Sequence, residues 1–337
     1  MFKELNKFFF YSVLTGLLSI AFLNFFVDSN YKFFKEKAKL TEIIKNIENN
    51  KSSLIPIEIN LRITKKILLD HLQFDRLDVL ICGSSRAVPI GNNLIKDKKI
   101  LNLSVENYNI KDIEGLCMDG FMKFHPKKII IEVQHLLFSK DNQMIGIDQL
   151  DPNILDSSKK INIFEKFLVY KYLDLFNLNY TKKNIIYLLE NYKLINNLTK
   201  NKNSFLVLNS DGSIDLNVKK NSIKEIKKNS VIQANSNYNL NLKLDNDIDK
   251  RLIALVNFFR ERSEVEILIL PYYPDFKKIS YLLNNNYIAI ENRYLNIKNL
   301  NNVNILGSYD AKVIGCEEKN FYDTFHFDLD CYKKIFK

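Results

Sequence analysis

The chain has 337 residues, of which 46% are hydrophobic, 12% aromatic and 26% charged, and its formal net charge is +10. This composition is typical of a folded protein and excludes a disordered or collagen-like chain. Lysine is spread along the whole sequence, and the densest basic stretch, Lys219 to Lys228, also holds Glu225. Because a nucleic-acid-binding protein concentrates its charge in a patch or stripe, we expect no nucleic-acid partner.

Residues 1–7 form a short N-terminal tail, and an uncharged apolar run follows from Phe8 to Val27. Its length is about the 20 residues that a helix needs to cross a bilayer. A cleavable signal peptide has a shorter apolar region and a small-x-small cleavage site, which the stretch Leu23–Val27 lacks. We therefore interpret residues 8–27 as an uncleaved transmembrane signal anchor. The flanking lysines do not favour a cytoplasmic N-terminus, but a long C-terminal domain can translocate regardless of local charge.

Residues 28–72 are predicted to form a helical connector that leaves the membrane. From residue 73 onwards, short apolar runs typical of buried strands alternate with helical patterns. The runs are Leu77–Cys82, Lys99–Leu103, Lys127–Val133, Val265–Leu270 and Asn302–Leu306, and the helical patterns are Asn109–Lys123, Ile248–Arg262 and Phe276–Asn285. This alternation predicts a three-layer α/β/α domain over residues 73–337, with a mostly parallel sheet covered on both faces.

Residues from about 150 to 245 interrupt the alternation. They hold an aromatic-rich helical section and then a polar segment with Asp211-Gly212-Ser213, which is typical of a small hairpin. We interpret this region as a helical insertion between consecutive strands of the sheet. Insertions at such places commonly form lids or binding loops.

The four cysteines are far apart in the sequence, and no two of them have a CxxC spacing: Cys82, Cys117, Cys316 and Cys331. We therefore expect neither a zinc ribbon nor a disulfide-dense scaffold. Cys82 is interpreted as a small buried residue at the end of a strand rather than as a second nucleophile. The cysteines and histidines show no metal-ligand spacing, so we expect no metal and no cofactor.

A serine-rich turn, Gly83-Ser84-Ser85-Arg86, follows the first predicted strand of the α/β domain directly. A serine at the carboxyl end of a strand lies where open α/β sheets bind their ligands. A serine hydroxyl is a weak nucleophile and needs a base to take its proton. By itself the turn favours a serine that caps a helix.

The candidate base lies near the C-terminus, where Asp323 precedes His326 by three residues. A carboxylate at this spacing can bond one ring nitrogen of the histidine and leave the other nitrogen free. The bond fixes the tautomer and stabilises the imidazolium that forms when the base accepts a proton. The Asp323–His326 pair can therefore act as the base that a nucleophilic serine needs.

Together the serine turn and the DxxH pair resemble the SGNH (GDSL-like) hydrolase superfamily. The resemblance implies a flavodoxin-like sheet and a triad in which Ser85 is the nucleophile, His326 the base and Asp323 the acid. Ser84 stands where the family often has Asp. The chain is most similar to membrane-anchored members of bacterial envelope pathways, of the lipoteichoic-acid D-alanylation and exopolysaccharide-acetylation types. The resemblance does not cover the insertion.

The same resemblance implies an oxyanion hole formed by the Ser85 N–H, the Asn107 N–H and the Gln134 side chain. Asn107 stands where the family usually has glycine, and Gln134 is one methylene longer than the family's asparagine. Losing one such donor costs roughly 100- to 1,000-fold in rate, so both departures bear on activity. Arg86 either binds an anionic or sugar substrate or pins the turn.

We therefore expect an enzyme that moves or removes an acyl group on a bacterial envelope glycan. Water as acceptor makes it an esterase, and a sugar hydroxyl makes it an O-acyltransferase. Its catalytic domain is expected to be periplasmic, anchored in the cytoplasmic (inner) membrane. The expected partners are the glycan or acylated sugar, the lipid around the N-terminal helix and a membrane-embedded acyl-donor protein. The alternative is a catalytically silent glycan-binding or assembly factor with the same fold.

Overall fold

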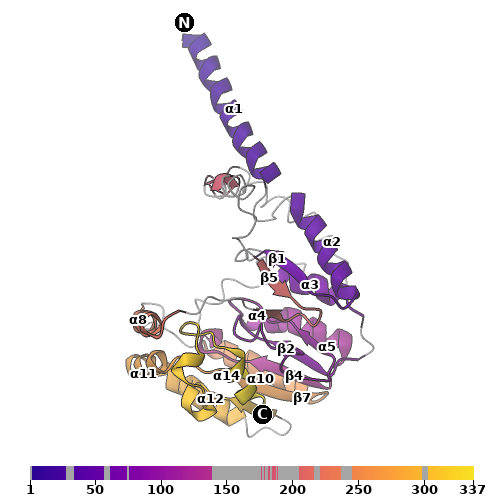
Figure 1. Ribbon diagram of the computed structural model, residues 1–337, viewed down its shortest axis with the longest axis vertical. Coiled ribbons are helices and arrows are strands. Elements are labelled where there is room, and N and C mark those ends of the chain that lie inside the picture. Colours follow the sequence, from indigo (N-terminus) through magenta and orange to yellow (C-terminus); the bar gives the residue numbers. More distant parts are fainter. Residues whose placement is uncertain are drawn as a thin grey trace.

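The computed structural model describes residues 2–27, 34–56, 61–73, 76–138, 205–215, 221–236, 245–297 and 303–337, together with eight residues between 176 and 188. The aromatic-rich section of the insertion that the sequence predicts lies mostly outside the described residues. The fold is given below for the described parts of the chain (Figure 1).

A five-stranded parallel sheet forms the centre of the α/β domain. Its strands, in spatial order, are β3 (Ile100–Asn102), β2 (Val79–Cys82), β4 (Lys128–Glu132), β7 (Glu264–Ile269) and β8 (Val303–Gly307). This is the flavodoxin-like order, in which the first strand along the chain lies between the second and the third. Every residue of β2 and β3 is buried, as expected of strands covered on both faces. The predicted α/β fold and all five predicted strands are confirmed.

Helices fill the connections between these strands, and their apolar faces pack on the sheet. The helix α10 has buried residues at Leu252, Leu255, Val256 and Phe259, the spacing of one helix face. The helices of the domain are α3 (Leu61–His71), α4 (Ile110–Asp112), η1 (Ile113–Cys117), α5 (Met118–Phe124), η2 (His135–Phe138), α8 (Ile223–Ala234), α10 (Asn246–Arg260), α11 (Pro274–Leu283), α12 (Asn286–Ile297), α13 (Ala311–Ile314), η6 (Glu318–Asn320) and α14 (Leu329–Ile335).

A second, antiparallel sheet joins the connector to the insertion. Its strands, in spatial order, are β1 (Ser53–Pro56), β5 (Phe205–Leu208) and β6 (Ile214–Asp215). The turn between β5 and β6 holds Asp211, so the hairpin expected there is confirmed. This turn docks on the parallel sheet, since the Asp211 carbonyl accepts a hydrogen bond from the Asn102 N–H at 2.8 Å. The strand β1 lies in the segment that the sequence predicts to be a helical connector.

The helix α3, which also lies in the predicted connector, packs into the core and carries a fully buried lysine. Lys65 Nζ donates hydrogen bonds to the carbonyl of Asn102, at 2.9 Å, and to that of Gly212. Burial is the main influence on its pKa and lowers it from 10.5 to about 7, although the nearby Asp211 charge opposes the shift. The lysine thus links α3, the edge strand β3 and the hairpin of the insertion.

The buried Lys65 predicts that the protein becomes more stable as the pH rises from 7 to about 10. In this window the unfolded chain, whose lysine keeps its ordinary pKa, binds more protons than the folded chain. The free energy of unfolding is therefore expected to rise by up to about 1.4 kcal/mol per pH unit. Urea denaturation of the wild type and of Lys65→Met at several pH values measures the effect. If the free energy of unfolding of Lys65→Met rises with pH as steeply as that of the wild type, Lys65 is not the cause of the effect.

All four cysteines are paired in two disulfides, which the sequence analysis did not anticipate. Cys82, at the end of β2, is bonded to Cys117 in η1, and Cys316 is bonded to Cys331 in α14. Cys82 is buried as expected, but it is not a free thiol. The first disulfide fixes the end of the strand that precedes the serine turn.

The helix α1 (Phe2–Val27) projects from the rest of the molecule, as Figure 1 shows, and α2 (Phe34–Glu48) lies between it and the α/β domain. Within α1, the span Phe9–Val27 has a mean hydropathy of 1.9, and only 6% of it is buried. Among the described helices, this one is long and apolar enough to cross a membrane. Length and composition alone do not distinguish this helix from an N-terminal signal sequence.

Candidate active site

The residues of the candidate site come from loops at the carboxyl ends of the parallel strands. Ser85 follows β2, Gln134 follows β4, and Tyr272 follows β7, while His326 lies between β8 and α14. In an open parallel sheet, ligands bind at this edge, where polar groups from distant parts of the chain converge. The fold therefore brings together residues that are 241 positions apart in the sequence.

The serine turn is held by a buried carboxylate at the end of β4. Glu132 Oε2 accepts a hydrogen bond from the Ser84 N–H at 2.6 Å. Gly83 is required beside it, because a Cβ at that position would lie 2.7 Å from atoms of Glu132 and of Ala87. Burial raises the pKa of Glu132, and the charge of Arg86 opposes that shift. The sequence analysis assigned no role to Glu132.

Ser85, His326 and Asp323 form a continuous hydrogen-bonded chain. The Ser85 Oγ lies 3.1 Å from His326 Nε2, and His326 Nδ1 lies 2.9 Å from Asp323 Oδ2. Since an ionised carboxylate only accepts hydrogen bonds, Nδ1 carries the proton in a neutral His326, and Nε2 accepts from the serine hydroxyl. The order hydroxyl, imidazole and carboxylate is the one that nucleophilic catalysis by serine requires.

The electrostatics of Asp323 keep it ionised beside the imidazole. Burial by itself raises the pKa of this carboxyl, but hydrogen bonds from the His326 ring and from the Phe325 and His326 backbone N–H groups outweigh burial and lower it. The loop that carries the pair is closed by a bridge between Phe321 and Phe327. Asp323 and His326 are thus held in place by hydrogen bonds within their own loop.

Arg86 is almost fully buried and joins the serine turn to two other loops of the site. Its Nε donates to the Phe325 carbonyl at 3.1 Å, and its Nη2 donates to the Pro271 carbonyl at 2.5 Å. Its guanidinium lies 4.4 Å from the centre of the Tyr272 ring. Arg86 therefore pins the turn through backbone carbonyls. It also lines the cavity beside Ser85, so a role in substrate binding stays a prediction.

The residues predicted to form the oxyanion hole lie around the same cavity as Ser85. Asn107 has a left-handed backbone, with φ of +50°, which asparagine tolerates better than most residues and which suits glycine. Its carbonyl accepts a hydrogen bond from Arg62 at 3.0 Å. Gln134 is buried and lines the same cavity. Their roles as oxyanion donors stay predictions.

A cavity of about 320 Å³ adjoins the serine and the histidine. Its apolar and aromatic lining comprises Leu136, Tyr272, Phe276, Tyr287 and Phe325, and its polar lining includes Asn107, Gln134, Gln233 and Ser236. Gln233 belongs to α8, and Ser236 follows that helix, so the insertion forms part of the wall. The helix α8 is joined to the loop of the acid and base by a buried hydrogen bond between Ser230 and Thr324 at 3.0 Å.

His135 also lines this cavity and is packed among tyrosine rings. Its ring centre is 4.2 Å from that of Tyr309 and 4.4 Å from that of Tyr287. Burial, followed by the positive charges of Arg86 and Lys277, lowers the pKa of His135 far below its ordinary value. His135 is thus a neutral core histidine. Among the described residues, no group of three His, Cys, Asp or Glu side chains is placed to hold a metal ion.

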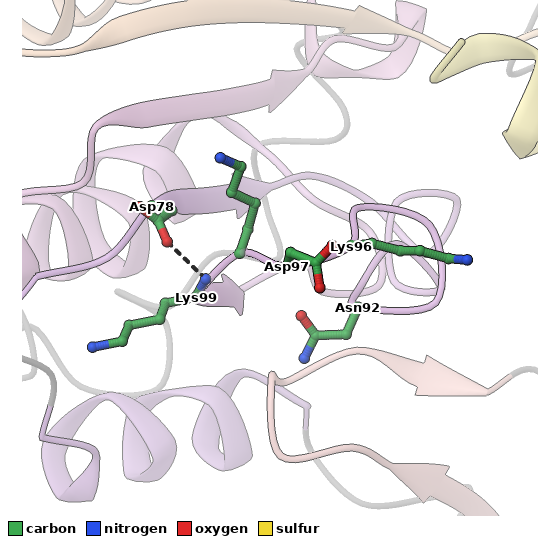
Figure 2. A pocket seen from close by; sticks show the side chains of 6 residues that line it. Asp78, Asn92, Lys96, Asp97 and Lys99 are labelled. Atoms are coloured by element: carbon green, nitrogen blue, oxygen red, sulfur yellow. Dashed lines mark hydrogen bonds between the residues drawn. The ribbon is translucent and has the colours of Figure 1, made fainter.

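A second hollow lies at the opposite edge of the sheet, where Asp78 and Lys99 precede β2 and β3 (Figure 2). Its lining is charged, and Asp78 accepts hydrogen bonds from the Lys99 N–H and from Lys127. No serine, cysteine or histidine is among the residues that line it. The serine turn and the Asp323–His326 pair thus lie at the other edge of the sheet from this hollow.

Comparisons with known proteins leave the family open. No protein-family model and no curated protein matches the chain. One similar solved structure is described as "a putative platelet activating factor from Streptococcus pneumonia"; it has a TM-score of 0.39 and 12% sequence identity over 90% of this chain and 95% of that chain. Two chains that differ this much share too little for an activity to be transferred from one to the other. The function must be argued from the site.

Proposed function

We propose that the protein is a membrane-anchored serine enzyme of the SGNH type that cleaves or transfers an acyl ester. The observation that carries the proposal is the chain of hydrogen bonds from Ser85 through His326 to Asp323. Neither a capping serine nor a structural histidine needs this arrangement. These three hydrogen-bonded side chains also lie at the edge of a parallel sheet where ligands bind, and Ser85 and His326 line a cavity there.

In the first half of the proposed reaction, Ser85 Oγ attacks the ester carbonyl and its proton moves to His326 Nε2. Asp323 stabilises the resulting imidazolium through Nδ1. The negative charge on the former carbonyl oxygen is held by the Ser85 and Asn107 N–H groups and the Gln134 amide. The intermediate collapses when the alcohol leaves with the proton from His326, so the acyl group stays on Ser85 as an ester.

In the second half, His326 takes a proton from an acceptor hydroxyl, and that oxygen attacks the Ser85 ester. The serine then leaves and recovers its proton from His326. Water as acceptor releases an acid, and a sugar hydroxyl yields a new ester. Because both outcomes use the same acyl-enzyme, the site supports an esterase and an O-acyltransferase equally well.

The cavity supports a small acyl group as the part of the substrate next to Ser85. Its volume of about 320 Å³ is at the lower end of the range for small-molecule sites. The aromatic rings of Tyr272, Phe276 and Phe325 offer apolar contact to a short acyl chain, while Gln233 and Ser236 offer hydrogen bonds to the alcohol side. A glycan, which is rich in hydroxyl groups, fits the polar side of the cavity as the alcohol part of the substrate.

The anchor and the disulfides favour an extracytoplasmic position for the catalytic domain. Disulfides form and persist in oxidising compartments such as the bacterial periplasm, and all four cysteines of this chain are paired. The span Phe9–Val27 holds the domain near the membrane surface in this proposal. An envelope glycan as substrate and a membrane-embedded acyl donor as partner fit that location.

Replacing Asp323 with asparagine is expected to lower kcat for p-nitrophenyl acetate by about 10⁴-fold, because the amide favours the wrong imidazole tautomer and loses the charge that stabilises the imidazolium. Asp330→Asn is the matched control, since Asp330 also has a lowered pKa but pairs with exposed Lys333. Steady-state kinetics of both variants test the role. If Asp323→Asn and Asp330→Asn lower kcat by the same factor, Asp323 does not have this role.

The proposed function is tested by trapping the acyl-enzyme. The full chain in detergent is mixed with p-nitrophenyl acetate, quenched in acid and digested, and mass spectrometry locates the acetyl group. We expect it on Ser85 in the wild type and in the control Ser52→Ala. Adding a methyl glycoside then shows whether acetate or acetylated sugar is the product. If no serine is acetylated and no ester is consumed, the catalytically silent glycan-binding protein is the better description.

A further inference from the structure

The apolar span of α1 contains an asparagine whose side chain is bonded to the insertion. Asn24 is fully buried; its Oδ1 accepts a hydrogen bond from Asn184 at 3.0 Å, and its Nδ2 donates to Thr181 at 2.9 Å. An unpaired amide in an apolar span is costly in lipid, so partners of this kind are expected. Figure 1 shows a short helix beside the domain-facing end of α1. Part of the insertion is therefore tied to the membrane span.

The depth of this contact follows from helix geometry. Asn24 lies three residues before Val27, the last residue of the span. At a rise of about 1.5 Å per residue, the contact is about 4.5 Å inside the end of the apolar segment. Helices that lie in a membrane interface bury their apolar faces about 5–10 Å deep. With α1 as the proposed anchor, Thr181 and Asn184 lie near the end of the apolar segment and so close to the membrane interface.

The described residues around Thr181 and Asn184 expose large apolar side chains. These are Phe176, Leu178, Ile185, Ile186 and Leu188. Leu178, which is 70% exposed, and Ile185, which is 44% exposed, both have helical backbone. Lys182, also exposed, lies between them in the sequence. An exposed apolar cluster beside a cation is typical of a surface that binds lipid.

We propose that the cluster of Phe176, Leu178, Ile185, Ile186 and Leu188 inserts into the interface of the bilayer that α1 spans. The occupant of this surface is lipid, because the cluster is continuous with the span through Asn24 and lies at interfacial depth. Lys182 is placed to contact anionic head groups. The insertion then holds the molecule to the membrane at a second point, beside the anchor. This inference rests on the membrane anchor of the proposed function.

Fluorescence quenching in vesicles tests the insertion of this cluster. Because all four native cysteines are paired, a single introduced cysteine can carry a bimane label. Leu178→Cys is compared with Phe9→Cys in the span and with Leu282→Cys on α11; these native side chains are 70%, 70% and 76% exposed. Figure 1 places α11 at the end of the molecule opposite α1. The full chain is reconstituted in phosphatidylcholine–phosphatidylglycerol vesicles that contain doxyl-labelled lipid.

We expect the labels at positions 178 and 9 to lose at least about half of their fluorescence, and the label at 282 to lose less than about a tenth. Quenching at position 9 without quenching at 178 would overturn the inference and leave the anchor intact. Absence of quenching at 9 would reject the anchor and the inference together. A label at 178 that is unquenched in vesicles, but shielded from a water-soluble maleimide in native membranes, would identify a protein partner instead and also overturn the inference.

Discussion

Ser85→Ala is expected to lower kcat/KM for p-nitrophenyl acetate by about 10⁴-fold or more, leaving only the rate that the oxyanion donors and substrate binding supply. The reason is that the variant has no oxygen 3.1 Å from His326 Nε2 to attack the ester. His326→Ala is expected to have a similar effect, since the serine then has no base. Steady-state kinetics with the full chain measure both.

The double variant Ser85→Ala/His326→Ala sharpens this test. Residues that act as one unit have non-additive effects, so the double variant is expected to be no slower than either single variant. Ser52→Ala is the control, because Ser52 is exposed and its Oγ donates a hydrogen bond to Asn209, in the turn between β5 and β6. Losses that multiply in the double variant, or a loss below about 10-fold in Ser85→Ala, would mean that the two residues do not form one catalytic unit.

Arg86→Met is expected to lower the free energy of unfolding by about 3 kcal/mol, because the buried guanidinium and its contact with the Tyr272 ring are lost. It also removes the hydrogen bonds that hold the Phe325 and Pro271 carbonyls. Since Phe325 precedes His326, the activity should fall with the stability. Urea denaturation in detergent gives the free energy, and the ester assay gives the rate.

Arg262→Met is the matched control for this stability effect. Arg262 also lies 4.4 Å from the centre of an aromatic ring, that of Phe258, but it is half-exposed and pairs with exposed Glu261. Its loss is expected to cost less than about 1 kcal/mol. If Arg86→Met lowers the free energy of unfolding no more than Arg262→Met does, the structural role of Arg86 is contradicted.

The parallel sheet was predictable because its strands are continuous apolar runs. Runs such as Leu77–Cys82 and Lys127–Val133 can be recognised locally, since both faces of each strand are buried. The strand β1 was not predictable, because it has four residues, includes Pro56 and gains its stability from pairing with a distant segment. The disulfides were missed for a related reason: cysteine pairing depends on which strand ends and helices the fold brings together.

The site was predictable where a motif follows a strand or sets a fixed spacing. Ser85 follows a strand directly, and Asp323 and His326 are three residues apart in one loop, so the local sequence is enough to single out each of them. Glu132 was not predicted because a charged residue at the end of a strand is usually exposed, whereas here it accepts the Ser84 N–H inside the core. Gln233 was missed because nothing in the sequence of the insertion indicates that α8 reaches the cavity.

The most direct test of the central claim is covalent labelling with a fluorophosphonate, which reacts only with a serine that a base has activated. The full chain is labelled in detergent, and mass spectrometry identifies the modified residue. We predict labelling of Ser85 in the wild type and in Ser52→Ala, and its loss in His326→Ala although that variant stays folded. Folded wild-type protein that is not labelled, or that is labelled on another serine, would contradict the account.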